Sequence, residues 1–556
     1  MDNTNRHEIY QSARSSEYWQ RLQMLSKQPW SLVSLFAQDN DRATRFSVRA
    51  GALYMDYSKQ CMNEQVLENL LQLAESCELT TRINALLQGA MVNTSEQRAA
   101  LHTALRLPET ATLTVDSQNV VADVHRSLTQ VARLSERVRH GTWRGFSGKA
   151  ITDVINIGVG GSDLGPLMAT TALDEWADTD IEVHFVSNMD GTHLDNLLKH
   201  LNPETTLFII SSKSFGTVDT LSNAKTALSW LLATAKLRAG TESSVLRRHF
   251  IGISANSEKM SAWGIHPDHQ LQLWDWVGGR FSLWSAIGLA IAIRIGMPKF
   301  KELLSGAHSM DEHFAEADFA ENLPVLLGLL AVWNSTFLQV NAHTVLPYDG
   351  RLSYLPSYLT QLEMESNGKS VTRHGDDIDY DTCPVLWGEI GSNAQHAFYQ
   401  LLHQGTQQVS CDFIACVRRY SDNAQNASLQ QQHELSLANC LAQSRVLAFG
   451  NAAIADIADV KVFSDADKYK YYRGNQPSTT LLIDELTPHS LGSLIALYEH
   501  KVYVMASLWD INPFDQWGVE MGKQMAESVH HAMQHDSEAQ FDTSTDQLLQ
   551  HIKQLS

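Results

Sequence analysis

The sequence contains little cysteine for its length. Its six cysteines are Cys61, Cys77, Cys383, Cys411, Cys416 and Cys440, and none belongs to a Cys-x-x-Cys pair. This usage argues against a disulfide framework and against the common zinc motifs. His433-Glu434 begins like a metalloprotease helix, but Leu437 stands where the second His is required. We therefore predict reduced, mostly buried thiols and no catalytic metal.

Basic charge and long apolar runs are also scarce. The formal net charge is −20, which argues against a broad surface for nucleic acid or anionic lipid. No run approaches the roughly 18 apolar residues that span a bilayer, and the first residues lack an apolar signal core. We expect a soluble, cytoplasmic protein without nucleic-acid or membrane partners.

Proline-rich, serine-rich and glutamine-rich tracts are absent too. The 556 residues are 44% hydrophobic and 19% charged, which is typical of a folded globular protein with a sizeable core. This length can accommodate two to four domains. Disorder is expected only at the ends.

The pattern of apolar and polar residues changes near residue 150. Residues 66–77 and 95–105 have helical patterns, the second with a predicted cap at Thr94 or Ser95. Apolar runs followed by polar turns and helices then predict a parallel α/β sheet, and a second α/β unit follows a helical region. The predicted strands cover 151–157, 182–187, 206–211, 409–417 and 445–449, and the helical region covers 282–340.

Two polar loops follow predicted strands. Residues 158–166 are rich in glycine, but Asp163 and Pro166 break the dinucleotide and Walker patterns. Two interpretations of this segment stay open, a ligand-binding loop and a tight structural turn. Residues 211–217 combine hydroxyls with the ammonium of Lys213 before a helix, which suits a phosphate monoester. The alternative is a Ser/Thr-rich cap that binds only water.

Three further segments carry candidates for acid/base chemistry. Arg280 follows two glycines and could stabilise an oxyanion, or it could form a surface ion pair. Glu363 and Glu365 stand two residues apart, and we expect only one of them to act as a base. His396 is expected near the start of a helix capped by Ser392 or Asn393, which would keep the imidazole neutral.

The C-terminal segment carries the last candidate. Asn512-Pro513 predicts the start of a helix that places Gln516 and Lys523 on one face. An ordinary amphipathic helix with a solvated lysine is the alternative. His403 shares the helical face of His396, and we predict a packing role for it.

Taken together, these segments resemble the phosphoglucose isomerase family. The similar blocks cover most of the chain in the same order, namely 53–59, 98–106, 143–166, 212–217, 277–285, 346–369, 387–406 and 492–523. The resemblance implies two sugar-isomerase (SIS) α/β domains at 121–290 and 291–511, each with a parallel sheet. It also implies an N-terminal helical region at 1–120, a C-terminal helical arm at 512–556, and a homodimer.

The resemblance also implies roles for individual residues. Glu365 matches the family's base, which moves a proton between C2 and C1 through a cis-enediol, and Arg280 matches the residue that stabilises its charge. His396 matches the ring-opening histidine, which the neighbouring subunit donates, and Lys523 matches the residue that assists at the ring oxygen. Phosphate-binding positions match Ser162, Ser212, Lys213, Ser214 and Thr217, and sugar-site positions match Gly161, Gln361 and Gln516.

The phosphate loop departs from the family's common pattern. Ser214, Gly216, Val218 and Asp219 replace Thr, Thr, Gln and Glu. Gly216 removes a hydroxyl, and Asp219 is shorter than the Glu that supports the ring-opening histidine. We expect altered phosphate affinity or ring opening, with the reaction unchanged.

The implied function is the cofactor-free interconversion of glucose 6-phosphate and fructose 6-phosphate, in glycolysis and gluconeogenesis. Acceptance of mannose 6-phosphate is open. A different class of function is a non-catalytic SIS-type sugar-phosphate sensor, which would need the phosphate loops but not Glu365, His396 and Lys523 together.

Overall fold

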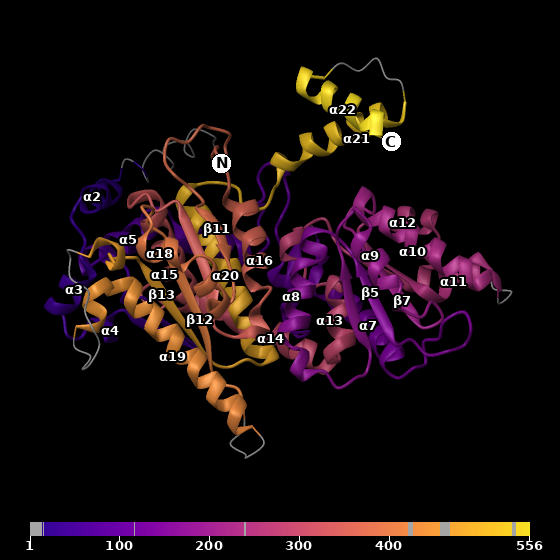
Figure 1. The fold of residues 1–556 in the computed structure, drawn as a ribbon, viewed down its shortest axis with the longest axis horizontal. Helices are drawn as coiled ribbons and strands as arrows, with labels where there is room; N and C mark the ends of the chain where they lie inside the picture. Colours follow the sequence, from indigo (N-terminus) through magenta and orange to yellow (C-terminus); the bar gives the residue numbers. More distant parts are fainter. Residues whose placement is uncertain are drawn as a thin grey trace. The chain divides into compact units, whose positions relative to one another are not determined.

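The computed structural model describes residues 14, 16–115, 117–237, 241–420, 426–455, 467–535 and 541–555. The chain divides into two compact units, one up to Pro513 and one from Phe514 onward. The first unit contains both large sheets (Figure 1). Its division into an N-terminal region and two domains stays a prediction. Within the described residues, no helix is long and apolar enough to cross a membrane.

The first large sheet has five parallel strands in the order β6-β5-β7-β8-β9. Its strands are β5 (Asp153–Ile157), β6 (Glu182–Val186), β7 (Thr206–Ser211), β8 (Phe250–Ser254) and β9 (Gln270–Gln272). Its helices are α7 (Val120–Arg139), α8 (Leu164–Ala172), α9 (Thr192–Leu198), α10 (Val218–Leu237), α11 (Glu242–His249), α12 (Ser257–Trp263) and α13 (Leu289–Ile295). The predicted strands at 151–157, 182–187 and 206–211 are therefore confirmed.

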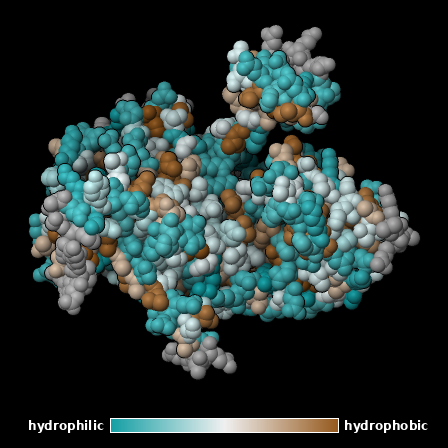
Figure 2. Space-filling view, in the orientation of Figure 1, coloured by the Kyte–Doolittle hydropathy of each residue, from teal (hydrophilic) through white to brown (hydrophobic). Residues whose placement is uncertain are grey.

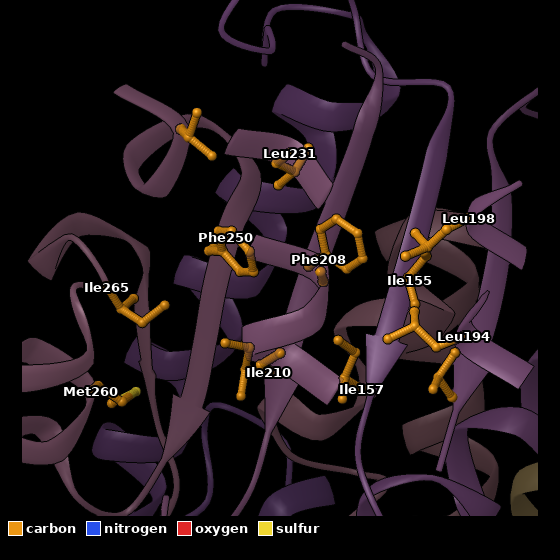
Figure 3. Close-up of a cluster of buried hydrophobic side chains, with 14 of the residues drawn as sticks. Ile155, Ile157, Leu194, Leu198, Phe208, Ile210, Leu231, Phe250, Met260 and Ile265 are labelled. Atoms are coloured by element: carbon orange, nitrogen blue, oxygen red, sulfur yellow. The ribbon is translucent and has the colours of Figure 1, made fainter. Parts of the chain in front are cut away.

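Apolar side chains of these strands form one core with the covering helices. Phe208 stacks on Phe250, with ring centroids 5.4 Å apart, and Ile155 and Leu231 lie in the same buried cluster (Figure 3). Strands buried on both faces need this near-continuous apolar sequence. On the surface shown in Figure 2, hydrophobic residues instead occur in small groups among hydrophilic ones.

The second large sheet is mixed rather than purely parallel, in the order β1-β2-β13-β12-β10-β11. Its strands are β1 (Ser47–Ala50), β2 (Leu53–Asp56), β10 (Ala342–Pro347), β11 (Val385–Gly388), β12 (Ser410–Arg418) and β13 (Ser478–Glu485). The four strands from β10 to β13 are parallel, but β2 pairs with β13 antiparallel. The N-terminal region is thus not only helical, because its hairpin extends this sheet. A short hairpin of β3 (Thr114–Val115) and β4 (Gln118–Asn119) stands apart.

Helices surround the second sheet and connect it to the first. They include α2 (Glu17–Leu25), α3 (Leu32–Gln38), α4 (Arg42–Arg45), α5 (Glu64–Ser76), α6 (Leu79–Leu87), α14 (Met297–Glu316), α15 (Leu323–Val332), α16 (Leu355–Thr360), α17 (Gly391–Ala397), α18 (Tyr399–Gln404), α19 (Ala427–Phe449) and α20 (Pro488–Trp509). Helix α20 is buried along nearly its whole length and packs on α14 and α15. Contacts between α8 and α16 join the two halves of the unit.

Two local predictions are wrong. Residues 95–105 form no amphipathic helix, because Asn93 and Arg98 pair as an isolated bridge and only the short η1 helix (Thr103–Arg106) follows. Glu96, expected inside that helix, forms an ion pair with Arg98 instead. Residues 445–449 end the helix α19 rather than forming a strand. Five of the six cysteines are buried, as predicted.

Candidate active site

Two loops of the first sheet meet at Gly161. A Cβ atom on Gly161 would lie 2.0 Å from the carbonyl oxygen of Gly279 and 2.6 Å from the amide nitrogen of Arg280. No larger residue fits here without moving the backbone. The Ser282 hydroxyl donates to the Gly279 oxygen at 2.6 Å and steadies this turn. Close packing of the glycine-rich segment against Gly279 therefore helps to fix the position of Arg280.

Arg280 is buried, with only 2% of its surface exposed, so the alternative of a surface ion pair is wrong. Its Nε donates to the Ser366 hydroxyl at 2.6 Å, and Nη2 donates to the Pro513 carbonyl at 2.5 Å. Its Nη1 lies 3.5 Å from Oε1 of Glu365. The guanidinium is thus held in a fixed direction beside one carboxylate.

Glu365 ends a short π-helical turn, η9 (Gln361–Glu365), which follows α16. The Gln361 amide donates to Oε2 of Glu365 at 2.8 Å. Gly160 has a φ of +60°, and a Cβ there would stand 2.8 Å from the Gln361 amide nitrogen. The Glu365 side chain remains 24% exposed. This carboxylate is oriented from two sides and still accessible, as a general base must be.

Glu363 has a different environment. Its carboxylate accepts a hydrogen bond from Lys501 Nζ at 2.8 Å, and both side chains are almost fully buried. Burial alone would lower the pKa of Lys501, but Glu363 and Asp412 outweigh it and hold that pKa above its usual value. The ion pair anchors η9 to α20. Of the two candidate carboxylates, only Glu365 is available to a ligand.

The polar loop after β7 precedes the 20-residue helix α10. The hydroxyls of Ser212 and Thr217 lie 3.1 Å apart. Phe215 has a φ of +45° and buries its ring in the core, whereas Ser214 and Gly216 are exposed. Hydroxyl groups therefore gather at the start of a long helix, where an anion is favoured. Asp219 lies in the first turn of that helix.

The Lys213 ammonium binds protein carbonyl groups. It donates to the oxygens of Asp275 and Val277 at 2.8 and 2.9 Å. Burial, reinforced by the positive charge of Arg98, lowers the pKa of Lys213 to about 8. This side chain ties the polar loop to the segment before Arg280. Its predicted contact with phosphate stays a prediction, as does that of Ser162, which lies in the short η2 helix (Gly160–Ser162).

His396 does not lie where the sequence pattern predicted. Helix α17 spans only Gly391–Ala397, Ile390 precedes it without a side-chain cap, and His396 is in its last turn. The expected influence of a helix N-terminus on this imidazole is therefore wrong. The side chain is exposed. His403, by contrast, pairs with the amide oxygen of Gln443 at 3.0 Å and packs on Tyr472, consistent with a packing role.

Lys523 and Gln516 belong to the second unit, which contains α21 (Glu520–Gln534) and α22 (Thr543–Leu555). The predicted helix start at Asn512-Pro513 is wrong, because α21 begins at Glu520 after the short η12 helix (Trp517–Val519). Lys523 is exposed and donates to the Glu520 carboxylate at 2.8 Å. Gln516 immediately precedes η12.

Two residues to which the sequence assigned no individual role, Ser366 and Lys369, hold the segment around Arg280. Besides the Ser366 hydroxyl, the Lys369 ammonium donates to the carbonyls of Ser366 and Asn512, both at 2.9 Å. Lys501 was also missed, because no local pattern connects α20 to η9. The signal for both residues was the polar run after Glu365, in which Ser366 is the first residue and Lys369 the fourth. In the described residues, no group of three or more potential metal ligands occurs, and independence of metals and cofactors stays a prediction.

Comparison with known proteins agrees with this arrangement. The family model described as phosphoglucose isomerase matches residues 56–549. The chain belongs to this family. It is 85% identical over 556 residues to a glucose-6-phosphate isomerase of Psychrobacter cryohalolentis, with both chains fully covered. It is 56% identical to glucose-6-phosphate isomerase 2 of Chromohalobacter salexigens, covering 92% of each chain.

A solved structure of a family member has the same fold. The crystal structure of a glucose-6-phosphate isomerase from Chlamydia trachomatis superposes with a TM-score of 0.83 at 29% identity, covering 98% of this chain and 99% of that one. The resemblance found in the sequence, and the α/β fold that it implied, are therefore confirmed. The family membership rests on nearly the whole chain rather than on isolated motifs.

Proposed function

We propose that this protein interconverts D-glucose 6-phosphate and D-fructose 6-phosphate by ring opening and proton transfer, without a metal or cofactor. The observation that carries the proposal is the oriented Glu365 carboxylate, 2.8 Å from the Gln361 amide and 3.5 Å from the Arg280 guanidinium. The names of its close relatives support the same reaction. No observation favours the alternative of a non-catalytic sensor.

The proposed chemistry begins with the phosphate, which the polar loop of Ser212, Ser214 and Thr217 anchors. Ring opening breaks the bond between C1 and the ring oxygen and moves a proton from the anomeric hydroxyl to that oxygen. His396 and Lys523 assist this step. The new carbonyl group then makes the neighbouring C–H bond more acidic. Anchoring at the remote phosphate makes these steps effectively unimolecular.

Glu365 then takes the proton from C2 of the open aldose. The electron pair of that bond forms the C1–C2 double bond of a cis-enediol intermediate, and negative charge grows on the former carbonyl oxygen. The fixed, buried guanidinium of Arg280 stabilises this charge. A proton moves from the C2 hydroxyl to the oxygen on C1, and Glu365 returns its proton to C1 as the C2=O bond of the ketose forms. Gln361 keeps the carboxylate aimed at both carbons.

The direct test measures conversion of fructose 6-phosphate by the purified protein in the presence of EDTA. A coupled glucose-6-phosphate dehydrogenase that is free of isomerase reports the product. We expect rapid conversion without added metal. Binding of fructose 6-phosphate without conversion would contradict the proposal. Parallel assays with mannose 6-phosphate define the substrate range.

We further propose a homodimer in which His396 acts in the active site of the neighbouring subunit. The exposed position of His396 on the short helix α17 is compatible with donation to a second chain. The expected cytoplasmic location also stays a prediction.

A hybrid dimer tests this arrangement. Glu365→Gln and His396→Gln subunits, each inactive alone, are co-expressed with different tags and the hybrid is purified. Donation between subunits predicts one intact site, and hence about half of the wild-type activity. If both residues act within one chain, every site of the hybrid is defective and no activity returns.

A further inference from the structure

Two polar groups lie close to Gly216 in the polar loop after β7. A Cβ atom on Gly216 would lie 3.3 Å from the Lys259 ammonium and 3.6 Å from the Ser214 hydroxyl. The ammonium of Lys259 on α12 and the hydroxyl of Ser214 in the loop thus lie near the same point. Gly216 is exposed and has no side chain to fill this point.

Lys259 is positioned by the connection between β8 and α12. Its backbone N–H donates to the Asn256 side chain at 2.9 Å, which caps α12. Two further bonds hold this connection against the loop, because the Ala255 N–H and the Ser254 hydroxyl donate to the Lys213 carbonyl at 3.0 and 2.9 Å. The Lys259 ammonium lies 3.4 Å from the Ser214 carbonyl oxygen. The ammonium therefore stands beside the hydroxyl-bearing loop.

The charges near the polar loop bear on the role of Lys259. A phosphate monoester dianion needs a compensating cation, and the protein as a whole carries a formal charge of −20. The ammonium of Lys213 is engaged by two carbonyl groups. Lys259 forms no ion pair with a carboxylate in the described part of the chain, so its charge is available to an incoming anion.

We propose that Lys259 binds the phosphate group of the substrate together with the neighbouring Ser214 hydroxyl. The proposal rests on the proposed isomerase function and adds a binding residue to it. A phosphate oxygen at this point would receive a charge-assisted hydrogen bond from Lys259 and a second bond from Ser214. Gly216 adds no side chain between these two donors.

The test compares Lys259→Met, Lys259→Arg and a control, Lys225→Met, at constant ionic strength. Lys225 is another exposed lysine, on α10. Loss of a hydrogen bond to a charged group predicts that Lys259→Met raises both KM for fructose 6-phosphate and the inhibition constant of inorganic phosphate about tenfold. We expect kcat to change less than about twofold, because the phosphate does not react.

The two other variants test whether the positive charge of Lys259 causes the loss of phosphate affinity. Lys259→Arg should restore most of the affinity, because it keeps a cation at the same place, and Lys225→Met should match the wild type. Lys259→Met with a wild-type KM and a wild-type inhibition constant would overturn the proposal. So would an equal loss in Lys225→Met, which would indicate a general effect of surface charge.

A binding measurement separates this proposal from the proposed function. Titration with inorganic phosphate, followed by phosphorus NMR of the full chain, needs no turnover. If the wild type binds phosphate and Lys259→Met binds it about tenfold more weakly, Lys259 is a phosphate ligand even in a protein that does not isomerise sugars. Equal binding by both proteins contradicts the role of Lys259, whatever the activity.

Discussion

The π-helical turn η9 and the polar loop at residues 212–217 serve the same candidate site but are built differently. In η9, Glu363 forms a buried ion pair with Lys501, and Ser366, directly after the turn, accepts a hydrogen bond from Arg280. In the polar loop, Ser214 and Gly216 are exposed, and both backbone bonds and the Lys213 side chain hold the chain. The turn that carries the proposed base is embedded in the protein, whereas Ser214 and Gly216 of the polar loop lie at the surface.

This difference reflects what each region must do. A base has to lie within hydrogen-bonding reach of one particular C–H bond, and a misplacement of about 1 Å can cost about a hundredfold in rate. Binding of a phosphate by several donors tolerates more variation. Accordingly, the chain departs from the family's common pattern in the polar loop and the first turn of α10, at Gly216, Val218 and Asp219.

The largest expected effect comes from Glu365→Gln. The substitution keeps the size of the side chain but removes the base, so we expect kcat to fall by about 10²–10⁴-fold. Binding of fructose 6-phosphate should persist. Steady-state kinetics and a binding titration check this, with Glu434→Gln on α19 as a control carboxylate. Near-normal turnover would remove Glu365 from its assigned role.

Lys501→Met removes the buried ion pair that holds η9 against α20. This variant leaves the Glu363 carboxylate buried without its partner, which should lower the free energy of unfolding by about 3–5 kcal/mol. Urea unfolding measures the loss. Lys501→Met combined with Glu363→Met should recover much of it. A loss below about 1 kcal/mol, typical of an exposed pair, would show that this ion pair does not hold the turn.

The attachment of the polar loop should depend on pH through Lys213. Its pKa of about 8 lies below the usual 10.5, so between these pH values the unfolded chain binds the extra proton. The free energy of unfolding therefore gains a contribution that rises with pH, by at most about 1.4 kcal/mol per pH unit. Denaturant unfolding at pH 8 and pH 10 should show this rise reduced in Lys213→Met. Equal slopes would contradict it.

The smallest effect is expected from restoring the family's residues in the loop. Gly216→Thr with Asp219→Glu should change KM for fructose 6-phosphate by a fewfold and leave the reaction the same. The added hydroxyl and the longer carboxylate alter phosphate contacts and ring opening, not proton transfer. Kinetics identical to those of the wild type would show that these positions do not tune the site.

Local patterns predicted the parts of the fold that depend on local sequence. The strand at 206–211 and its polar loop were recognised because an apolar run ends in hydroxyl residues. The helix expected at 95–105 fails because Arg98 and Asn93 form a bridge instead, a tertiary outcome that overrides propensity. The ion pair of Glu363 with Lys501 joins residues 138 positions apart, and no periodicity could indicate it.

Some residues of the candidate site were likewise predictable from the sequence, and others were not. Glu365 and Arg280 were named from the sequence, but the choice between Glu363 and Glu365 needed the resemblance or the geometry. Lys259 could not be found, because only the folded sheet brings it to Gly216. His396 was found by resemblance, while the helix position assigned to it from the pattern was wrong.

Proton transfer by Glu365 is the central claim, and exchange of hydrogen with solvent tests it most directly. Glucose 6-phosphate deuterated at C2 is converted in ordinary water, and the deuterium at C1 of the product is measured by mass spectrometry. The account predicts partial loss of deuterium to the solvent with the wild type, and a rate of loss that falls with turnover in Glu365→Gln. Turnover by Glu365→Gln at the wild-type rate, with the same loss of deuterium, would contradict the assignment of Glu365 as the base.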